Sequence, residues 1–151
     1  MQIIGILNVP RNKNMKKYLV IGNPIEHSLS PKLHNYWLNK NKIDGNYEKK
    51  LLTDDKVGEL LKSNQNISGI NVTVPFKKNV INYCTELTEL ALSSQSVNTI
   101  TFSNEKIIGD NTDIYGFEKS LKDLKFNGLN KTAFILGAGG VVSSVVIALN
   151  N

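Results

Sequence analysis

The sequence predicts an α/β fold in which a domain with a mostly parallel sheet is followed by the opening of a second α/β unit. Short apolar runs of β-branched residues alternate with segments whose apolar residues recur at helical spacing. Proline and glycine mark the junctions between these segments. Alternation of strand and helix in this order is typical of parallel strands joined by helical crossovers.

Composition limits the size of the protein and the class of its ligand. The 151 residues suffice for one core and part of a second. No apolar run reaches the ~18 residues of a membrane span or forms a signal-peptide core, so we expect a cytoplasmic protein without a membrane partner. The net charge of +5 comes from scattered lysines, which argues against nucleic acid and favours a small anionic ligand.

Metal binding is not expected. The single cysteine, Cys84, excludes an internal disulfide and a cysteine metal cluster, and we expect it to be a buried core thiol. The two histidines, His27 and His34, are not spaced as metal ligands on one helix face.

The first strand, at residues 18–21, leads into a loop that carries two serines. Ser30 precedes Pro31, a pattern in which serine caps a helix and proline occupies its first turn. Ser28 and Ser30 therefore lie at the carboxyl end of the strand, where open α/β sheets bind ligands. The alternative is a turn residue and a helix cap. The apolar face of the helix is expected to consist of Leu33, Tyr36, Trp37 and Leu38.

Residues 71–77 are predicted to begin as a buried strand, because their first apolar members are β-branched. Pro75 cannot donate to a sheet ladder, so the strand should stop there and a helix should begin at Phe76. The alternative is a strand–helix junction with a solvated lysine. Three polar side chains would lie at one carboxyl edge of the sheet, namely Asn71, Thr73 and Lys77.

The remaining elements follow from the same patterns. Helices are expected at residues 53–62, at 86–94 and after Asp113, which with Thr112 could simply cap that helix. Strands are expected at residues 46–52, 96–102 and 106–109.

The last segment has the pattern of a dinucleotide-binding turn. Residues 132–136 are expected to form a buried strand, which runs into four small residues, Gly137 to Gly140, and then into a helix. Glycines let the backbone approach a pyrophosphate, which rests on the helix N-terminus. Val142 stands where the fingerprint asks for glycine or alanine. The side chain that would meet the adenosine ribose is not among these residues.

Taken together, these segments resemble the shikimate dehydrogenase (shikimate/quinate dehydrogenase) family, with the carboxyl-terminal part truncated. The matching stretches are residues 22–24, 28–31, 71–77, 96–99, 109–113 and 137–140. The resemblance implies an N-terminal substrate-binding α/β domain at 15–112, a linking helix and loop at 113–130, and the first strand and helix of an NADP-binding Rossmann domain at 131–151. Residues 1–14 are interpreted as an extension or a mis-assigned start.

The resemblance also implies an activity. It is the NADP-dependent, reversible reduction of 3-dehydroshikimate to shikimate, in the biosynthesis of chorismate and aromatic amino acids. The fragment alone is expected to be inactive, and a homodimer is a further expectation. One alternative is a quinate/shikimate dehydrogenase that uses NAD. The other is a non-catalytic fragment that binds shikimate.

The family's functional residues carry over by motif. Lys77 is expected to be the catalytic acid/base, paired with Asp113, and also to contact the substrate. Ser28 and Ser30 would hold the substrate carboxylate. Thr73, Asn98 and Asp113 would hold the ring hydroxyls, with Asn71 nearby. The cofactor residues would be Gly137, Ala138, Gly139, Gly140 and Val141, with Glu89 a weaker candidate near the nicotinamide. The sequence departs from the family at Ile114, where glycine is usual, and at Val141 and Val142, where small residues are usual.

Overall fold

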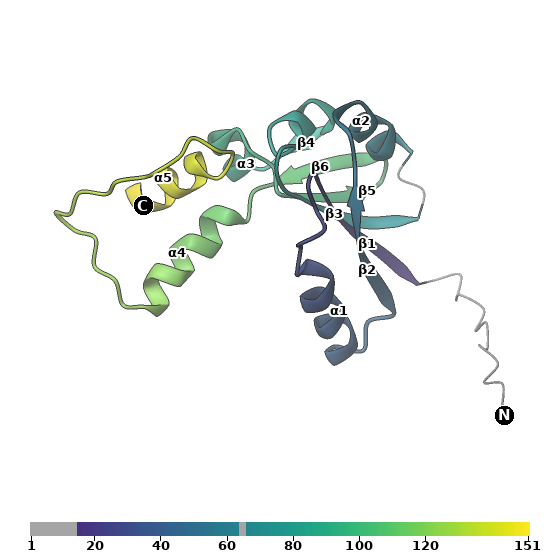
Figure 1. Cartoon of the computed structure of the whole chain (residues 1–151), viewed down its shortest axis with the longest axis horizontal. Helices are drawn as coiled ribbons and strands as arrows, with labels where there is room; N and C mark the ends of the chain where they lie inside the picture. Colours follow the sequence, from purple (N-terminus) through teal and green to yellow (C-terminus); the bar gives the residue numbers. More distant parts are fainter. Residues whose placement is uncertain (1–14, 64–65) are drawn as a thin grey trace.

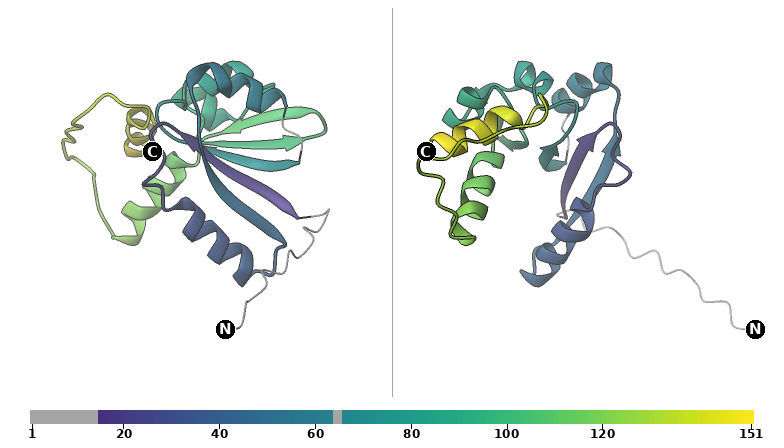
Figure 2. Two further views of the ribbon diagram at one scale, coloured as in Figure 1. Left: turned by 45° about the vertical axis from the view of Figure 1, so that its right-hand side comes forward. Right: turned by 60° about the vertical axis from the view of Figure 1, so that its left-hand side comes forward.

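The computed structural model describes residues 15–63 and 66–151 and contains one six-stranded sheet with helices on both faces (Figure 1, Figure 2). The expected extension at residues 1–14 lies outside the described residues. In chain order the elements are β1 (Lys16–Gly22), α1 (Ser30–Lys40), β2 (Gly45–Leu51), α2 (Asp54–Lys62), β3 (Ile67–Val72), the 3-10 helix η1 (Asn79–Tyr83), β4 (Glu86–Leu87), α3 (Glu89–Ser94), β5 (Thr99–Ser103), β6 (Lys106–Asp110), α4 (Asp113–Asp123) and α5 (Val142–Asn150).

The sheet is mostly parallel, as the sequence predicted. Its strand order is β2-β1-β3-β5-β6-β4. β1 pairs in parallel with β2 and β3, and β4 with β6, whereas β5 is antiparallel to β3 and β6. β5 and β6 form a hairpin whose turn residues, Asn104 and Glu105, both have positive φ, as a type I′ turn requires. The predicted α/β class is confirmed, with one antiparallel strand inserted.

One face of the sheet carries the main hydrophobic core. Alternate side chains of β1, β3 and β5 pack there against α2 and the segment around η1. Removal of this apolar surface from water stabilises the fold by roughly 25 cal/mol per Å². The buried side chains include Leu19, Ile21, Ile70, Val72 and Ile100 from the strands, and Val57, Leu61, Phe76 and Val80 from the covering layer.

Helix α1 lies on the other face and covers it only in part. No residue of α1 is buried, and Tyr36 and Trp37 are 59% and 45% exposed. A hollow of about 500 Å³ opens between α1 and the strands β3 and β5. The predicted apolar face of α1 was therefore wrong for Leu33, Tyr36 and Trp37. Only Leu38 packs inward, against the cluster of Val20, Ile25 and Tyr47.

Strand β3 ends at Val72, earlier than the predicted end at Pro75. Thr73 N–H still donates to Ile21 O (2.9 Å), but the chain then turns, and η1 follows in place of the predicted helix. The turn forms early because Phe76 N–H donates back to Thr73 O (3.0 Å). Both predicted boundaries were wrong, while the order of the elements was right.

Ser30 is not the helix cap that the sequence predicted. Helix α1 begins at Ser30 itself, and Leu29 is its N-cap residue. The hydroxyl of Ser28 accepts the Ser30 N–H (3.3 Å), so Ser28 satisfies the backbone donor at this helix start. Pro31 lies in the first turn, as predicted.

Two other elements begin later than predicted. The helix expected at residues 86–94 is divided between β4 and α3, because Thr88 Oγ1 accepts the Ala91 N–H (3.2 Å) and starts the helix there. The strand expected at residues 96–102 begins only with β5. Val97 N–H donates to the loop after β3 instead of to a neighbouring strand.

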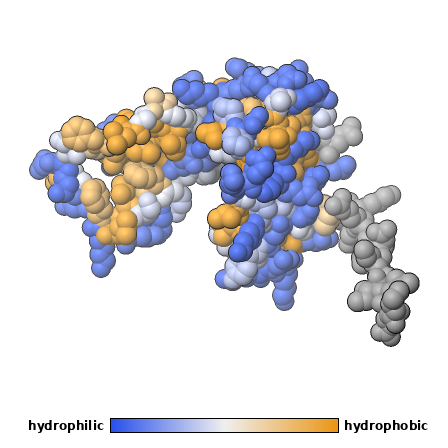
Figure 3. Space-filling view, viewed as in Figure 1, coloured by the Kyte–Doolittle hydropathy of each residue, from blue (hydrophilic) through white to orange (hydrophobic). Residues whose placement is uncertain are grey.

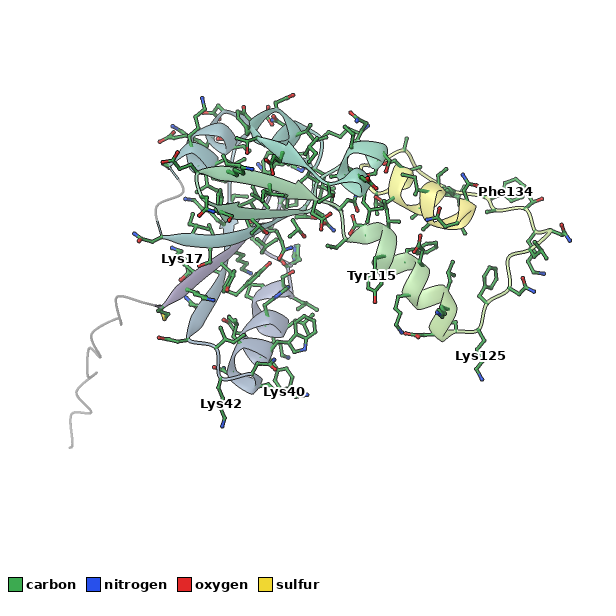
Figure 4. All side chains as sticks on the ribbon, turned by 180° about the vertical axis from the view of Figure 1, so that it is seen from behind. Lys17, Lys40, Lys42, Tyr115, Lys125 and Phe134 are labelled. Atoms are coloured by element: carbon green, nitrogen blue, oxygen red, sulfur yellow. The ribbon has the colours of Figure 1, made fainter. Side chains whose placement is uncertain are left out.

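The predicted buried strand at residues 132–136 is wrong. The structure forms no strand there, and Phe134 and Leu136 are 90% and 100% exposed. Figure 4 shows Phe134 on this segment, away from the sheet. A strand needs a neighbour that takes up its backbone hydrogen bonds, and no strand of the described residues lies beside this segment. Figure 3 shows hydrophobic residues gathered over α5, α4 and the chain between them.

Cys84 is half-buried and was predicted to be fully buried. Its thiol donates to Val80 O (3.4 Å), and burial raises the pKa of the thiol to about 11. The reactive thiolate is therefore scarce near neutral pH. Within residues 15–63 and 66–151, no helix is long and apolar enough to cross a membrane, and no group of side chains could hold a metal ion.

His34 gives the fold a pH dependence. Its ring stacks on Tyr47 with centroids 4.2 Å apart, and burial lowers the pKa of the imidazole from its usual value. The unfolded chain therefore binds this proton at a higher pH than the folded chain. As pH falls below about 6.5, the free energy of unfolding should decrease.

Urea unfolding at pH 7.5 and 5.5 checks this expectation. His34→Asn should lose less stability between the two pH values than wild type. A His34→Asn protein that loses as much stability as wild type would contradict the assignment to His34.

Candidate functional site

Four chain segments meet at one edge of the sheet. The carboxyl ends of β1, β3 and β6 point the same way, because β5 is antiparallel to both of its neighbours. The amino end of β5 lies at the same edge. This is the edge at which open α/β sheets bind ligands. The structure brings five of the predicted side chains to this edge, from four segments: Ser28 and Ser30 after β1, Lys77 after β3, Asn98 before β5 and Asp113 after β6.

An ion pair occupies the centre of this edge. Lys77 Nζ lies 2.6 Å from Asp113 Oδ2, and the two side chains are only 14% and 25% exposed. The other carboxylate oxygen, Oδ1, accepts a hydrogen bond from Asn98 Nδ2 (2.8 Å). Val97 N–H donates to Lys77 O (2.8 Å) and holds the lysine backbone beside the start of β5. An ammonium held in this way can donate a proton to a developing oxyanion, with the carboxylate orienting it.

The amide of Asn98 is fixed from both ends. Its Oδ1 accepts from Thr112 N–H (3.0 Å) and from Thr99 Oγ1 (3.0 Å). Its Nδ2 donates to Asp113 Oδ1 and also to Thr112 Oγ1 (3.0 Å). Because each end has partners of the right kind, the orientation of the amide is determined.

Asn71 is held in place by protein groups. Its Nδ2 donates to Thr99 Oγ1 (3.2 Å) and to Asn98 O (3.3 Å), and its Oδ1 accepts from the Tyr47 hydroxyl (2.6 Å). Burial raises the pKa of the Tyr47 phenol above its usual range, and a hydrogen bond with Ser30 opposes part of this shift. Sequence reasoning missed Tyr47, although its place beside Tyr18 on the α1 face follows from strand alternation.

Ser28, Ser30 and Thr73 line one hollow of about 260 Å³. No described residue hydrogen-bonds the hydroxyl of Thr73. The exposed His27, which sequence reasoning did not assign to the site, also lines this hollow. Hydroxyl groups with open hydrogen-bonding capacity suit a polar or anionic ligand.

The turn at residues 137–140, called the glycine turn below, faces Lys77 across a second hollow of about 290 Å³. A Cβ added to Gly140 would lie 3.6 Å from Lys77 Cβ, so the turn approaches the lysine closely. Gly137 has φ +126°, which favours glycine, and open space lies beside Gly137 and Gly139. Val74 lines this hollow and also the hollow of Ser28, Ser30 and Thr73, called the serine hollow below. The two hollows are therefore adjacent.

These features fit the diphosphate of a dinucleotide. The backbone beside Gly137 and Gly139 is open, and α5 begins two residues after Gly140 with its N-terminus in this turn. A helix N-terminus favours an anion, because its first N–H groups lack partners within the helix. Ala138 lines the same hollow, and Val141 is exposed at the N-cap of α5.

Glu89 and the residue after Asp113 lie apart from this constellation. Glu89 is exposed in the first turn of α3 and lines neither hollow. Ile114, at the position where the sequence departs from the family, is buried in the first turn of α4, whereas Tyr115 projects from the helix (Figure 4).

Comparison with known proteins agrees with this arrangement. The family model for the shikimate dehydrogenase substrate binding domain matches residues 20–100. A shikimate dehydrogenase (NADP(+)) from Pelagibacter ubique (strain HTCC1062) is 58% identical over 136 residues, which are 89% of this chain and 51% of that protein. The chain spans about half the length of the curated relatives it matches.

Solved structures give the same result. A shikimate dehydrogenase from Aquifex aeolicus superimposes with a TM-score of 0.87 at 35% identity, over 92% of this chain and 53% of that one. A shikimate 5-dehydrogenase from Thermus thermophilus, solved in complex with NADP(H) and shikimate, gives a TM-score of 0.84 at 31% identity. The match covers 90% of this chain and 52% of that one.

Proposed function

Because the chain belongs to the family of the shikimate dehydrogenase substrate-binding domain, we propose that it carries the substrate half of an NADP-dependent shikimate dehydrogenase. The reaction is the reversible reduction of 3-dehydroshikimate to shikimate. The observation that carries the proposal is the Lys77–Asp113 ion pair, held by Asn98 between a serine-lined hollow and a glycine turn.

Lys77 is the acid/base in this proposal. The nicotinamide cofactor, when bound, supplies the hydride. In the direction of reduction the Lys77 ammonium donates a proton to the carbonyl oxygen as it becomes an alkoxide, and in the direction of oxidation the neutral amine accepts it. Asp113 keeps the ammonium directed at the reacting oxygen through the 2.6 Å contact.

The remaining polar residues bind the substrate. Ser28 and Ser30 hold its carboxylate, because their hydroxyls share one hollow at the start of α1. Thr73, Asn98 and Asp113 hold ring hydroxyls. Asn71 supports them through its bonds to Thr99 and to the Asn98 carbonyl. A site built from so many hydrogen-bonding groups rejects analogues that leave them unpaired.

The glycine turn is the cofactor side of the proposed site. Gly137, Ala138, Gly139, Gly140 and Val141 would hold the pyrophosphate of NADP. A place for Glu89 near the nicotinamide stays a prediction. We also propose the division into a substrate domain at residues 15–112, a linker at 113–130 and the start of a Rossmann domain at 131–151. A cytoplasmic location and a homodimer stay predictions.

A direct absorbance assay of cofactor reduction tests the proposed function. The protein expressed from its complete natural gene should reduce NADP⁺ in the presence of shikimate, with absorbance rising at about 340 nm. Turnover with NAD⁺ and quinate at a comparable rate would favour the quinate/shikimate alternative. Shikimate binding without turnover by either cofactor would favour the non-catalytic alternative, and absence of both binding and turnover would contradict the proposal.

Ser28→Ala is expected to act on substrate binding. Loss of a hydrogen bond to a carboxylate costs about 1.5–3 kcal/mol, so the KM for shikimate should rise about 10- to 100-fold with little change in kcat. Because Ser28 also accepts the Ser30 N–H, the melting temperature should be measured as a control. An unchanged KM would show that Ser28 is only a turn residue.

A further inference from the structure

The buried polar residues of the described chain form one cluster, and none of them lines the serine hollow or the hollow beside the glycine turn. They are Ser94, Ser96, Asn111 and Ser144, and each is at most 2% exposed. Burial of a polar group is unfavourable unless the group is hydrogen-bonded. Their concentration at one place, where α3, the end of β6 and α5 meet, therefore calls for a specific explanation.

Asn111 is the centre of this cluster. Its Oδ1 accepts the Asp113 N–H (3.0 Å), so the asparagine satisfies a donor in the first turn of α4. Its Nδ2 lies within hydrogen-bond distance of Ser94 Oγ (2.8 Å), Ser144 Oγ (2.9 Å) and Ser96 O (2.9 Å). One amide thus joins the residue that pairs with Lys77 to α3 and to α5.

The orientation of this amide is dictated by its partners. Ser96 O can only accept, and Ser94 Oγ uses its own proton on Leu90 O (2.7 Å). Ser96 O and Ser94 Oγ therefore require a donor at Nδ2, whereas the Asp113 N–H requires an acceptor. Asparagine satisfies both sides, and aspartate of the same shape would place a buried charge against the Ser96 carbonyl.

A second link runs from the same cluster to the glycine turn. Ser96 Oγ donates to Gly140 O (2.9 Å). Ser144 lies in the first turn of α5, directly after that turn. The cluster therefore touches the nucleotide turn at Gly140 and α5 at Ser144, and it touches the substrate side at the backbone of Asp113.

We propose that Asn111 is a positioning residue that fixes the Asp113 carboxylate relative to the glycine turn. The inference rests on the proposed function. Asn111 is fully buried and touches neither hollow, so it acts through Asp113 and through Ser144. The hydrogen bonds of its amide hold Asp113, and with it the Lys77–Asp113 pair, at a fixed distance from the glycine turn.

The kinetic consequence differs from that of a purely structural residue. A loosened link should leave shikimate bound at the serine hollow but should misplace the proton-transfer pair against the cofactor. Small misplacements of reacting groups cost rate because the reactive geometry is visited less often. We therefore expect a lower kcat with a nearly unchanged KM for shikimate.

Ser144→Ala is the informative variant, because Asn111→Leu removes every bond at once and endangers folding. Ser144→Ala removes only the contact of Asn111 to α5 and retains its contacts to Ser94 of α3 and to Ser96 O. Ser143→Ala is the matched control, since Ser143 is the preceding residue of α5 and makes no side-chain hydrogen bond within the described residues.

Two measurements on the protein expressed from its complete natural gene test whether Asn111 positions Asp113. Without cofactor, amide hydrogen exchange at Asp113 should become about tenfold faster in Ser144→Ala and remain unchanged in Ser143→Ala. With cofactor and shikimate, kcat per folded molecule should fall about tenfold in Ser144→Ala, with KM for shikimate within about twofold of wild type.

The proposal is overturned if Ser144→Ala lowers only the melting temperature, with exchange at Asp113 and kcat per folded molecule as in wild type. Failure of the proposed function is a separate result, visible as absence of turnover in the wild-type protein. The exchange comparison needs no turnover, so it still decides whether Asn111 couples Asp113 to α5.

Discussion

Lys77→Met is expected to lower kcat about 10²- to 10⁴-fold while the KM for shikimate changes little. The substitution keeps the length and most of the packing of the side chain but removes the ammonium that pairs with Asp113 beside the glycine turn. Hydride transfer without a proton for the oxygen leaves an unstabilised alkoxide. Steady-state kinetics with shikimate and NADP⁺ measure both constants.

The matched control is Lys119→Met. Lys119 also pairs with an aspartate, Asp123, but this pair lies exposed on α4. Exposed pairs of this kind contribute little to stability, about 0.3–0.5 kcal/mol. The Lys119→Met variant should keep the kcat of the wild-type protein. A kcat for Lys77→Met within a few-fold of wild type would remove Lys77 from the role of acid/base.

Asp113→Asn is expected to lower kcat/KM about 10²- to 10³-fold. Both carboxylate oxygens are in use, one by Lys77 Nζ and the other by Asn98 Nδ2. An amide in place of the carboxylate must direct its N–H₂ at one of these donors, and it leaves the Lys77 charge largely buried without a counter-charge. Unlike Lys77→Met, this change should affect kcat and KM together, since Asp113 is also proposed to bind a ring hydroxyl.

Asp123→Asn serves as the control, because it removes the exposed aspartate of the Lys119 pair. Its kcat/KM should match wild type. If Asp113→Asn changed only the melting temperature and left kcat/KM intact, the 2.6 Å contact with Lys77 would be a structural ion pair.

The sequence predicted the fold class and the meeting of the functional side chains, because both depend on strong local signals. β-branched runs that alternate with segments of helical spacing, separated by glycine and proline, indicate an α/β chain with a mostly parallel sheet. Residues that directly follow parallel strands must arrive at one edge of the sheet. Ser28, Lys77 and Asp113 could therefore be placed near one another before their distances were known.

The errors arise where backbone hydrogen bonds or neighbouring layers outweigh local preference. Phe76 N–H closes a turn on Thr73 O, and this ends β3 before Pro75. Apolar residues on α1 stay exposed because only Leu38 reaches the core cluster on that face. Residues 132–136 have a strand-like composition, but none of the six strands among the described residues pairs with them.

Tyr47 and Asn111 were missed for another reason. Each acts through contacts with residues far away in the sequence, Asn71 for the tyrosine and Ser144 for the asparagine. Strand alternation places Tyr47 on the α1 face, but no local pattern marks the long-range contacts of either residue. Asn111 lies two positions before Asp113, and only the three-dimensional structure shows that its amide bridges α3, α4 and α5.

The central claim is that one sheet edge holds shikimate between the two serines and the Lys77–Asp113 pair. The most direct measurement is a titration of the isotopically labelled protein with shikimate, followed by the NMR signals of backbone amides. We predict shifts that saturate together at residues 28–30, 73, 74, 76, 77, 98 and 113. Absence of shifts there, or shifts confined to the hollow beside α1 at Trp37, Ile43 and Thr101, would contradict the claim.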